Sequence, residues 1–380
     1  MRFDTRLVHV GQRPVPGTGD VVPPIHLSTT YDRTAQDPPR YFYARGEQPN
    51  REALEECLAA LEDARHATVY TSGQAAATTA LSLVPPGRLV LASDDVYGGT
   101  HQLLAAAAAE RGVTVRPVDL ADPAERDRAL SECGPELAMV WLETPTNPLL
   151  KVADIAAVSD LAHRHGALVV VDNTLAGPVL QRPLAHGADI TLYSTTKSVA
   201  GHLDVLGGAL VYRDEELHRR FLAYRTVAGN APGGFDCYLT HRGLKTLSLR
   251  TARQVENTRA VVAALLSEPS VATVSYPGLP THPQHAVAAR QMTAPGALAA
   301  FEYRGDPAKL LDRVRLFTAA VSLGGVRSLI ECPALMTHRP VPPEVRRRLG
   351  LTDRLIRISP GIEDPADLVE DLVTALRDGA

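Results

Sequence analysis

One lysine, Lys197, lies among small hydroxyl side chains directly after an apolar run, in the stretch LYSTTKSVAGHLDV. A lysine in a partly desolvated site can lose its proton and form a Schiff base with an aldehyde. The neighbouring Ser194 and Thr196 carry hydroxyl groups that could bind a phosphate beside it. Taken alone, the stretch fits a surface turn with a solvated lysine better, so the rest of the chain must decide.

A second candidate anion site is Ser72-Gly73-Gln74, which opens a predicted helix. The free N–H groups and the positive dipole end at a helix start attract phosphate, and Gly73 lets an anion approach the backbone. An ordinary N-cap with Ser72 as the capping residue explains this segment slightly better when it is considered alone.

Asp172 and Tyr97 follow two further predicted strands. A carboxylate at the end of the buried strand ALVVVD needs a partner, such as the protonated ring nitrogen of a cofactor, although a cap or a salt bridge would also serve. Tyr97 could stack on a flat cofactor, but a tyrosine at this point more often packs against its neighbours. A phosphate site, a ring-nitrogen partner, a lysine for an aldehyde and an aromatic ring together specify pyridoxal 5′-phosphate.

The elements that must position these residues alternate between strand and helix. We predict strands at 67–73, 88–95, 137–143, 167–173, 188–194 and 208–213, and helices at 51–64, 74–84, 101–112 and 153–166. Short, nearly all-apolar strands between helices are typical of a parallel sheet that is buried on both faces. Ligands bind beyond the carboxyl ends of such strands. The polar clusters fall there: Ser72-Gly73, Tyr97 to Gly99, Glu143 to Asn147, Asp172-Asn173 and Ser194 to Lys197.

The pattern changes along the chain and divides it into three regions. Residues 1–50 are rich in Pro, Gly and aromatic residues and show little helical period, which indicates an arm that packs on something else. Residues 51–240 form the predicted α/β domain with the cofactor site. Residues 241–380 begin with a long helical stretch and continue with mixed strands and helices, which predicts a smaller C-terminal α+β domain.

Composition excludes several kinds of partner. The chain has 380 residues, 45% hydrophobic content and a formal net charge of −4, without a basic block of the kind that binds nucleic acid. Its start lacks an apolar signal region, and no apolar run is long enough to cross a membrane. The four cysteines are scattered, with no Cys-x-x-Cys pair and no metal-like spacing with histidine. We therefore expect a cytoplasmic protein with free thiols, no metal, no nucleic-acid partner and no membrane partner.

Ordered motifs along nearly the whole chain resemble the Cys/Met-metabolism family of pyridoxal-phosphate enzymes, which includes cystathionine γ-lyases, cystathionine γ-synthases and methionine γ-lyases. The motifs include VVPPIHLSTTY, YTSGQAA, DDVYGGTH, ETPTNP, VVVDNT, YSTTKSVAGHLDV, FDCYLTHRGLKTL, YPGLPTHPQH, SLGGVRSLIECPALMTH and LIRISPGIED. The resemblance implies the fold type I transferase architecture, which is a mostly parallel sheet flanked by helices. Within the family, FDCYLTHRGLKTL and YPGLPTHPQH favour cystathionine γ-lyase.

The resemblance also implies residue roles that the pattern alone does not give. Tyr43 and Arg45 match the Tyr-x-Arg pair that reaches the cofactor phosphate of a neighbouring subunit. Arg357 matches the arginine that binds the substrate α-carboxylate, with Asn147 and Ser322 in the same pocket, and a guanidinium–carboxylate fork suits that task.

The catalytic residues implied by the resemblance are Lys197 and Tyr97. Lys197 would hold the cofactor and move protons on the substrate. Tyr97 would stack on the cofactor ring and assist exchange or protonation of the leaving group. Because the site borrows residues from a neighbour, the resemblance implies a homo-oligomer, with a tetramer as the habit of the family.

The chain departs from the family pattern at several positions. Residues 47–50 read Glu-Gln-Pro-Asn where the family usually has Gly-Asn-Pro-Thr. Gln74 replaces an apolar residue, although its backbone N–H can still bind phosphate. Gly99 is not the cysteine of methionine γ-lyases, which argues against that activity. Arg327 replaces a glutamate that would line the distal substrate pocket, which leaves the exact substrate open.

We therefore expect cleavage of the Cγ–S bond of L-cystathionine, and the alternative is γ-replacement on an activated homoserine, possibly in secondary metabolism. Both reactions share every catalytic residue. Tyr193-x-x-x-Lys197 also fits the short-chain dehydrogenase pair, but that class needs a glycine-rich turn after its first strand, and residues 1–60 offer none. A non-catalytic family member is disfavoured because Lys197, Asp172 and Arg357 are all present.

Overall fold

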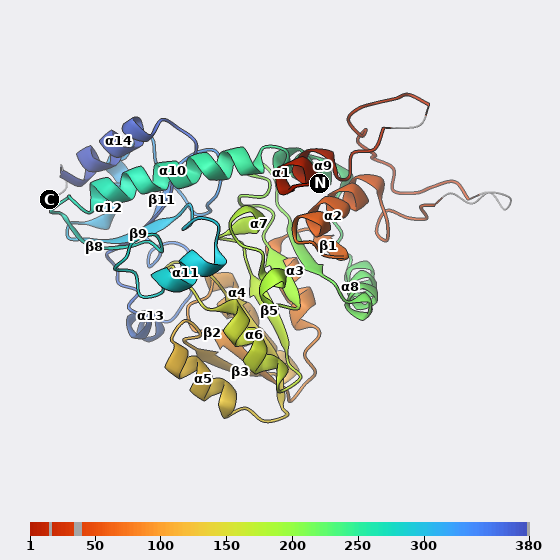
Figure 1. The fold of residues 1–380 in the computed structure, drawn as a ribbon, viewed down its shortest axis with the longest axis horizontal. Coiled ribbons are helices and arrows are strands. Elements are labelled where there is room, and N and C mark those ends of the chain that lie inside the picture. The colour runs from red at the N-terminus through yellow and green to blue at the C-terminus, as the bar shows by residue number, and fades with distance from the viewer. Residues whose placement is uncertain (15–16, 34–39, 378–380) are drawn as a thin grey trace.

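The computed structural model describes residues 1–14, 17–33 and 40–377. Two β-sheets, one of seven strands and one of five, are each packed against helices (Figure 1). The long helix α10 (Leu247–Leu265) runs across the top of the molecule from the first sheet to the second.

The seven-stranded sheet has the order β1-β7-β6-β5-β4-β2-β3. Only β7 is antiparallel to its neighbours, so the sheet is mostly parallel, as predicted. Its strands are β1 (His66–Tyr70), β2 (Leu89–Ser93), β3 (Thr114–Val118), β4 (Leu137–Glu143), β5 (Leu168–Asp172), β6 (Ile190–Tyr193) and β7 (Gly208–Tyr212). The helices of this part are α2 (Pro49–Leu61), α3 (Gly73–Leu81), α4 (Gly98–Arg111), α5 (Pro123–Ser131), α6 (Ile155–His163), α7 (Gly177–Leu180), α8 (Glu215–Ala228), α9 (Gly234–Leu244) and the 3-10 turn η1 (Pro183–His186).

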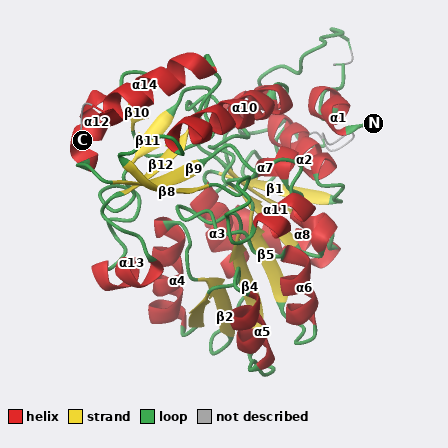
Figure 2. Cartoon of the chain, turned by 60° about the vertical axis from the view of Figure 1, so that its left-hand side comes forward, coloured by secondary structure: helices red, strands yellow, loops and turns green. Residues whose placement is uncertain are grey.

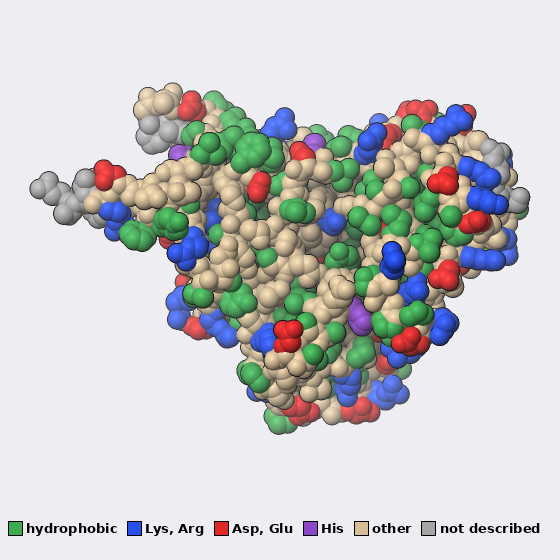
Figure 3. Space-filling model, turned by 180° about the vertical axis from the view of Figure 1, so that it is seen from behind, with side chains coloured by type: hydrophobic (Ala, Val, Ile, Leu, Met, Phe, Trp, Pro, Cys, Tyr) green, Lys and Arg blue, Asp and Glu red, His purple; other side chains and the backbone are tan. Residues whose placement is uncertain are grey.

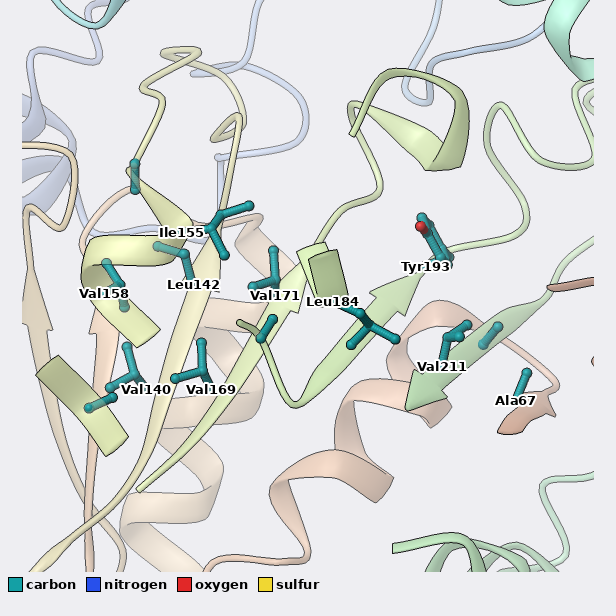
Figure 4. Close-up of a cluster of buried hydrophobic side chains, with 14 of the residues drawn as sticks. Ala67, Val140, Leu142, Ile155, Val158, Val169, Val171, Leu184, Tyr193 and Val211 are labelled. Carbon is teal, nitrogen blue, oxygen red and sulfur yellow. The ribbon is translucent and has the colours of Figure 1, made fainter. Parts of the chain in front are cut away.

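The central strands are buried on both faces, which explains their apolar sequences. On one face, Val140 of β4 and Val169 of β5 pack with Ile155 and Val158 of α6 (Figure 4). On the other face, Trp141 of β4 packs in a second cluster. A strand covered on both faces is hydrophobic throughout, because alternate side chains point to opposite layers.

The five-stranded sheet has the order β10-β11-β12-β9-β8 and packs beneath α10 and α14 (Figure 2). Its strands are β8 (Val271–Ser275), β9 (Ala299–Tyr303), β10 (Thr318–Ala319), β11 (Leu329–Glu331) and β12 (Leu355–Ser359). The remaining helices are α11 (His285–Gln291), α12 (Pro307–Arg313), α13 (Pro343–Leu349) and α14 (Pro365–Arg377). The second α+β part is therefore present, while the boundary at residue 241 stays a prediction.

We call the described residues that precede α2 the arm, and its predicted end at residue 50 stays a prediction. Helix α1 (Phe3–His9) buries Leu7 against α2, and the chain then continues in an extended arm that projects from the body (Figure 3). Two parts of the arm pair through an antiparallel bridge between Thr30 and Tyr43. Within the described residues, no helix combines the length and the apolar character that a membrane crossing requires.

Candidate active site

A cavity of about 210 Å³ lies at the carboxyl ends of β1, β2, β4, β5 and β6, closed on one side by the second sheet. The polar clusters that follow these strands meet there. The predicted site residues that line it are Gly73, Gln74, Tyr97, Asn147, Asp172, Ser194, Thr196, Lys197, Ser322 and Arg357.

Lys197 follows β6 by one short turn, and its side chain is largely buried in the cavity. Its Nζ donates a hydrogen bond to Ser322 Oγ at 2.9 Å. Burial, and then the positive charge of Arg357, lower the pKa of Lys197 to about 8. A charged amine loses hydration in such a site, so the neutral, nucleophilic form is favoured. Lys197 is therefore a buried reactive amine and not a solvated surface residue.

The start of α3 and the end of β6 form one end of the cavity. Ser72 caps α3, since its Oγ accepts from the backbone N–H of Ala75 at 3.1 Å. A Cβ at Gly73 would lie 2.8 Å from Ser194 Cβ, so only glycine allows the helix start to pack so closely on β6. Thr196 Oγ1 lies beside them and accepts from Gly207 N–H at 2.9 Å. Backbone donors and hydroxyls thus gather where an anion can bind.

Asp172, the last residue of β5, also lines the cavity and is buried. Burial raises the pKa of Asp172 to about 6, while hydrogen bonds from Thr174 act in the other direction. One carboxylate oxygen accepts from Thr174 N–H at 3.0 Å. A protonated ring nitrogen beside this carboxylate would stabilise its charged form and lower its pKa again.

The sequence-based predictions named Glu143 only as the first residue of a polar cluster and gave it no role in the site. It ends β4, directly beside Asp172 on β5, and burial followed by repulsion from Asp172 raises the pKa of Glu143 well above its usual value. Its two oxygens accept from the backbone N–H groups of Tyr97 and Asn147, both at 2.9 Å. The side chain therefore fixes two strand-end turns that carry predicted site residues. Its position at the last residue of an apolar strand was the available signal.

Tyr97 is the N-cap residue of α4, lines the cavity and is 41% exposed. A Cβ at Gly99 would lie 2.6 Å from the Tyr97 ring and 2.4 Å from Gln74 Nε2. The two departures from the family pattern, Gln74 and Gly99, are therefore neighbours in space. The missing side chain at position 99 leaves room for the amide at position 74.

Arg357 reaches the cavity from β12 of the second sheet and is 2% exposed at its side chain. Its Nη1 donates to Asn147 Oδ1 at 2.9 Å and lies 2.8 Å from Glu331 Oε1, and its Nη2 donates to the carbonyl of Ser322. Glu331 is 0% exposed and pairs in register with Arg357 across β11 and β12. Sequence reasoning missed Glu331, which lies inside the apolar run SLIECP.

These residues fit pyridoxal 5′-phosphate. The helix start and hydroxyls provide an anion cradle that a Cβ at Gly73 would fill, and Asp172 provides a carboxylate for the ring nitrogen. Lys197 lines the same cavity with a lowered pKa, as attachment to an aldehyde requires.

Three predicted residues lie outside the residues that line this cavity in the described chain: Tyr43, Arg45 and Arg327. Tyr43 is 42% exposed on the arm, and the guanidinium carbon of Arg45 lies 5.5 Å from the centre of its ring. Arg45 Nη1 donates to the carbonyl of Thr226, at 3.0 Å. Arg327 is exposed. One chain thus brings together the cofactor and carboxylate residues but not the arm residues.

Tyr193 does not complete a dehydrogenase pair with Lys197. Its ring is buried in the core on the side of the sheet that faces α6 (Figure 4), and its hydroxyl donates to Glu62 and accepts from Asn173 Nδ2. Alternate residues of a strand point to opposite faces, which separates Tyr193 from the cavity.

The match to known proteins extends over the whole chain. The family model for Cys/Met metabolism PLP-dependent enzymes matches residues 4–377. The chain is 46% identical over 378 residues to the cystathionine gamma-synthase of Mycobacterium tuberculosis, covering 98% of this chain and 96% of that protein. It is 43% identical over 383 residues to the cystathionine gamma-lyase of Dictyostelium discoideum, covering 99% and 97%.

Among solved structures, the CalE6 protein of Micromonospora echinospora superposes with a TM-score of 0.97 at 64% identity and full coverage of both chains. That structure is described as a cystathionine gamma-lyase. A second structure, of apo CalE6, has a TM-score of 0.93, 63% identity and 99% coverage of both chains, and it is described as a methionine gamma-lyase.

Proposed function

The chain belongs to the Cys/Met-metabolism family of pyridoxal-phosphate-dependent enzymes, and on this premise we propose that it is a carbon–sulfur lyase. The proposed reaction cleaves the Cγ–S bond of L-cystathionine to L-cysteine, 2-oxobutanoate and ammonia. The observation that carries the proposal is the 64% identity, over the full length, to a protein described as a lyase. The buried amine of Lys197 beside Arg357 provides the proton-transfer group that elimination needs.

The residues that hold the cofactor divide between its two ends. The N-terminal N–H groups of α3 and the hydroxyls of Ser194 and Thr196 would bind its phosphate, and Asp172 would hold its ring nitrogen protonated. Tyr97 would cover one face of the ring. When bound, the cofactor supplies an electron sink for negative charge at the substrate carbon atoms.

The other side chains act on the substrate. Arg357, held by Asn147 and Glu331, would bind the α-carboxylate and orient the Cα–H bond toward Lys197. Because the pKa of Lys197 is lowered to about 8, a larger fraction of its amine is neutral near physiological pH than of an ordinary lysine, and the neutral amine can take up the Cα proton. The phenol of Tyr97 would deliver a proton to the departing sulfur.

The alternative is γ-replacement, in which a thiol adds to an activated homoserine. The 46% identity to a cystathionine gamma-synthase favours it as the second candidate. The same residues serve both reactions, because the two differ only in the steps after the γ-substituent has departed. The description of CalE6 as a methionine gamma-lyase adds methionine as a third substrate to test, despite Gly99.

We further propose a homo-oligomer, with a tetramer built from dimers. Tyr43 and Arg45 would reach the cofactor phosphate of the partner subunit, since they lie exposed on an arm and away from their own cavity. Arg327 would face the distal end of the substrate. These roles rest on the family resemblance and on the exposure of the three side chains.

A product assay tests the proposed reaction. Holoenzyme is supplied in parallel with cystathionine, methionine, and an O-acyl-homoserine plus cysteine. We expect 2-oxobutanoate and cysteine from cystathionine at the highest kcat/KM. Efficient formation of cystathionine from the O-acyl-homoserine with little 2-oxobutanoate would establish the replacement reaction instead, and release of methanethiol at the highest kcat/KM would establish a methionine lyase.

A further inference from the structure

Two buried amides lie where the arm meets the body. Gln48 is 3% exposed and Asn50 is 4% exposed, although several arm residues directly before them are solvent-exposed. Both belong to the segment 47–50, in which this chain departs from the usual Gly-Asn-Pro-Thr of its family. Buried amides require hydrogen-bond partners, so their contacts define what this segment does.

The two amides bond to the backbone of the arm. Asn50 Oδ1 accepts from His26 N–H at 2.8 Å, and Asn50 Nδ2 donates to the carbonyl of Pro24 at 2.8 Å. Gln48 Nε2 donates to the carbonyl of His26 at 2.8 Å, while Gln48 Oε1 accepts from Arg51 N–H at 2.9 Å and so caps α2. Each amide therefore joins the arm to the start of a rigid helix.

The packing around this network depends on a glycine. A Cβ at Gly234, the first residue of α9, would lie 2.4 Å from Gln48 Nε2 and 2.6 Å from the carbonyl oxygen of His26. A larger residue would force the amide and the arm apart. Helices α2 and α9 thus meet at the point where the arm is bound.

The bound part of the arm is connected to the part that carries Tyr43 and Arg45. Ala44 N–H donates to the carbonyl of Thr29 at 2.9 Å, next to the antiparallel bridge between Thr30 and Tyr43. From the opposite side, Arg51 Nη2 donates to the carbonyls of Ala44 and Gly46, at 2.6 and 3.0 Å.

Arg225 binds the Gly46 carbonyl as well, at 3.1 Å, and forms a buried ion pair with Glu55. The backbone on both sides of Arg45 is therefore held by hydrogen bonds, while the Arg45 side chain is exposed and donates to the carbonyl of Thr226. Such an arrangement fixes a side chain for a ligand that its own subunit does not provide.

We propose that Gln48 and Asn50 form an amide clamp that positions Tyr43 and Arg45 for the cofactor phosphate of the partner subunit. A threonine at position 50 has no amide and a shorter reach, and an asparagine at position 48 is one methylene shorter than the glutamine that spans from α2 to His26. The clamp is thus particular to the Glu-Gln-Pro-Asn segment of this chain. It rests on the proposed role of Tyr43 and Arg45.

The test compares two mixed oligomers that contain the same two substitutions in different arrangements. The first combines an Asn50→Ala chain with a Lys197→Ala chain, so the site with an intact lysine receives an unmodified arm. The second combines a wild-type chain with an Asn50→Ala/Lys197→Ala chain, so that site receives the modified arm. Cofactor-stripped samples are titrated with pyridoxal 5′-phosphate, and borohydride fixes the cofactor only at sites that contain Lys197.

We expect the half-saturating cofactor concentration to be about tenfold higher in the second oligomer than in the first, as two lost hydrogen bonds would produce. Asn50→Asp keeps the bond from His26 N–H and loses the bond to Pro24, so the same comparison should give a few-fold difference. Gln102→Ala, which removes an exposed amide on α4, should give none.

Equal half-saturation in the two Asn50 oligomers would overturn the clamp, because overall destabilisation cannot depend on which chain carries the change. The same pair of oligomers made with Arg45→Ala separates the two proposals. A difference for Arg45 without one for Asn50 removes the clamp alone. No difference for Arg45 removes the partner role on which the clamp rests.

Discussion

Two regions carry comparable chemistry in different surroundings. The first is the floor of the cavity, by which we mean Lys197 and Arg357 with the residues that bond to them. The second is the arm, which carries Tyr43 and Arg45. Arg357 is 2% exposed, bonds to Asn147 and is paired with the fully buried Glu331. Arg45 is exposed, and its guanidinium bonds only to one backbone carbonyl among the described residues. One chain therefore completes the floor, whereas the arm presents groups whose ligand must come from outside.

The exposed apolar side chains also distinguish the arm from the buried part of the site. Large apolar side chains are solvent-exposed on the arm, at Val21, Leu27 and Phe42, and among the residues that line the cavity, at Leu206 and Val321. Exposed large apolar side chains that gather in one region are typical of a protein interface. The buried residues of a site can therefore be assigned from the structure of one chain, whereas the exposed residues need the partner chain to show their contacts.

The largest expected effect is on the floor. Lys197→Ala should lower turnover by on the order of 10⁴-fold, because it removes both cofactor attachment and the proton-transfer group. The purified variant should also lose the yellow colour of the wild-type holoenzyme. Lys309→Ala, a change of an exposed lysine on α12, serves as the control and should retain both. A colourless wild-type protein that takes up no added pyridoxal phosphate would contradict the whole account of the floor.

Glu331→Leu should be the most destabilising change at the floor. It leaves the Arg357 guanidinium buried without its carboxylate, which costs about 3–5 kcal/mol of unfolding free energy. Denaturant unfolding of the cofactor-free protein measures this. The exposed pair Arg253–Glu256 on α10 is the matched control, and Glu256→Leu should cost below about 1 kcal/mol. Equal losses for the two variants would show that Glu331 does not support Arg357.

The pH dependence of cofactor uptake reports the pKa of Lys197. Because this pKa is lowered to about 8, the neutral amine should increase about tenfold per pH unit below pH 8 and then level off. The initial rate of borohydride-fixed attachment to cofactor-free protein should follow the same curve. A rate that continues to rise toward the ordinary lysine pKa would indicate a solvated amine and an open floor.

Arg327 should give the smallest effect. The side chain is exposed, so its charge acts through water, and Arg327→Glu should change the kcat/KM ratio of cystathionine to O-succinyl-homoserine by about fivefold in favour of cystathionine. A glutamate attracts the distal ammonium of cystathionine, whereas the arginine attracts a distal carboxylate. If the ratio does not change, Arg327 does not face the substrate. The charge at position 327 then has no bearing on the proposed lyase activity.

Much of the first sheet could be predicted because burial on both faces leaves continuous apolar runs. β4 and β5 fall within the predicted ranges for this reason. β3 was not predicted, since this edge strand contains Arg116 and Pro117 and leaves most of its residues exposed or half-buried. β11 was also missed, because three residues are too short to show a period.

The site residues could likewise be predicted only in part. Asp172 ends the apolar strand β5 and Lys197 follows the apolar strand β6, so their convergence could be expected from the rule for parallel sheets. Glu331 could not, because its role depends on the antiparallel register that places it opposite Arg357. Tyr43 and Arg45 could be suggested only by resemblance, since the residues that they are expected to meet belong to another copy of the chain.

The central claim is that a complete site takes its floor from one subunit and its arm from another. Mixing Arg45→Ala and Lys197→Ala chains tests this most directly, since random pairing in a symmetric dimer makes about a quarter of all sites wild type. We predict that two weakly active or inactive parents regain about that fraction of wild-type activity. Activity no greater than that of the parents, with mixing confirmed by native mass spectrometry, would place Arg45 outside the partner's site and contradict the account.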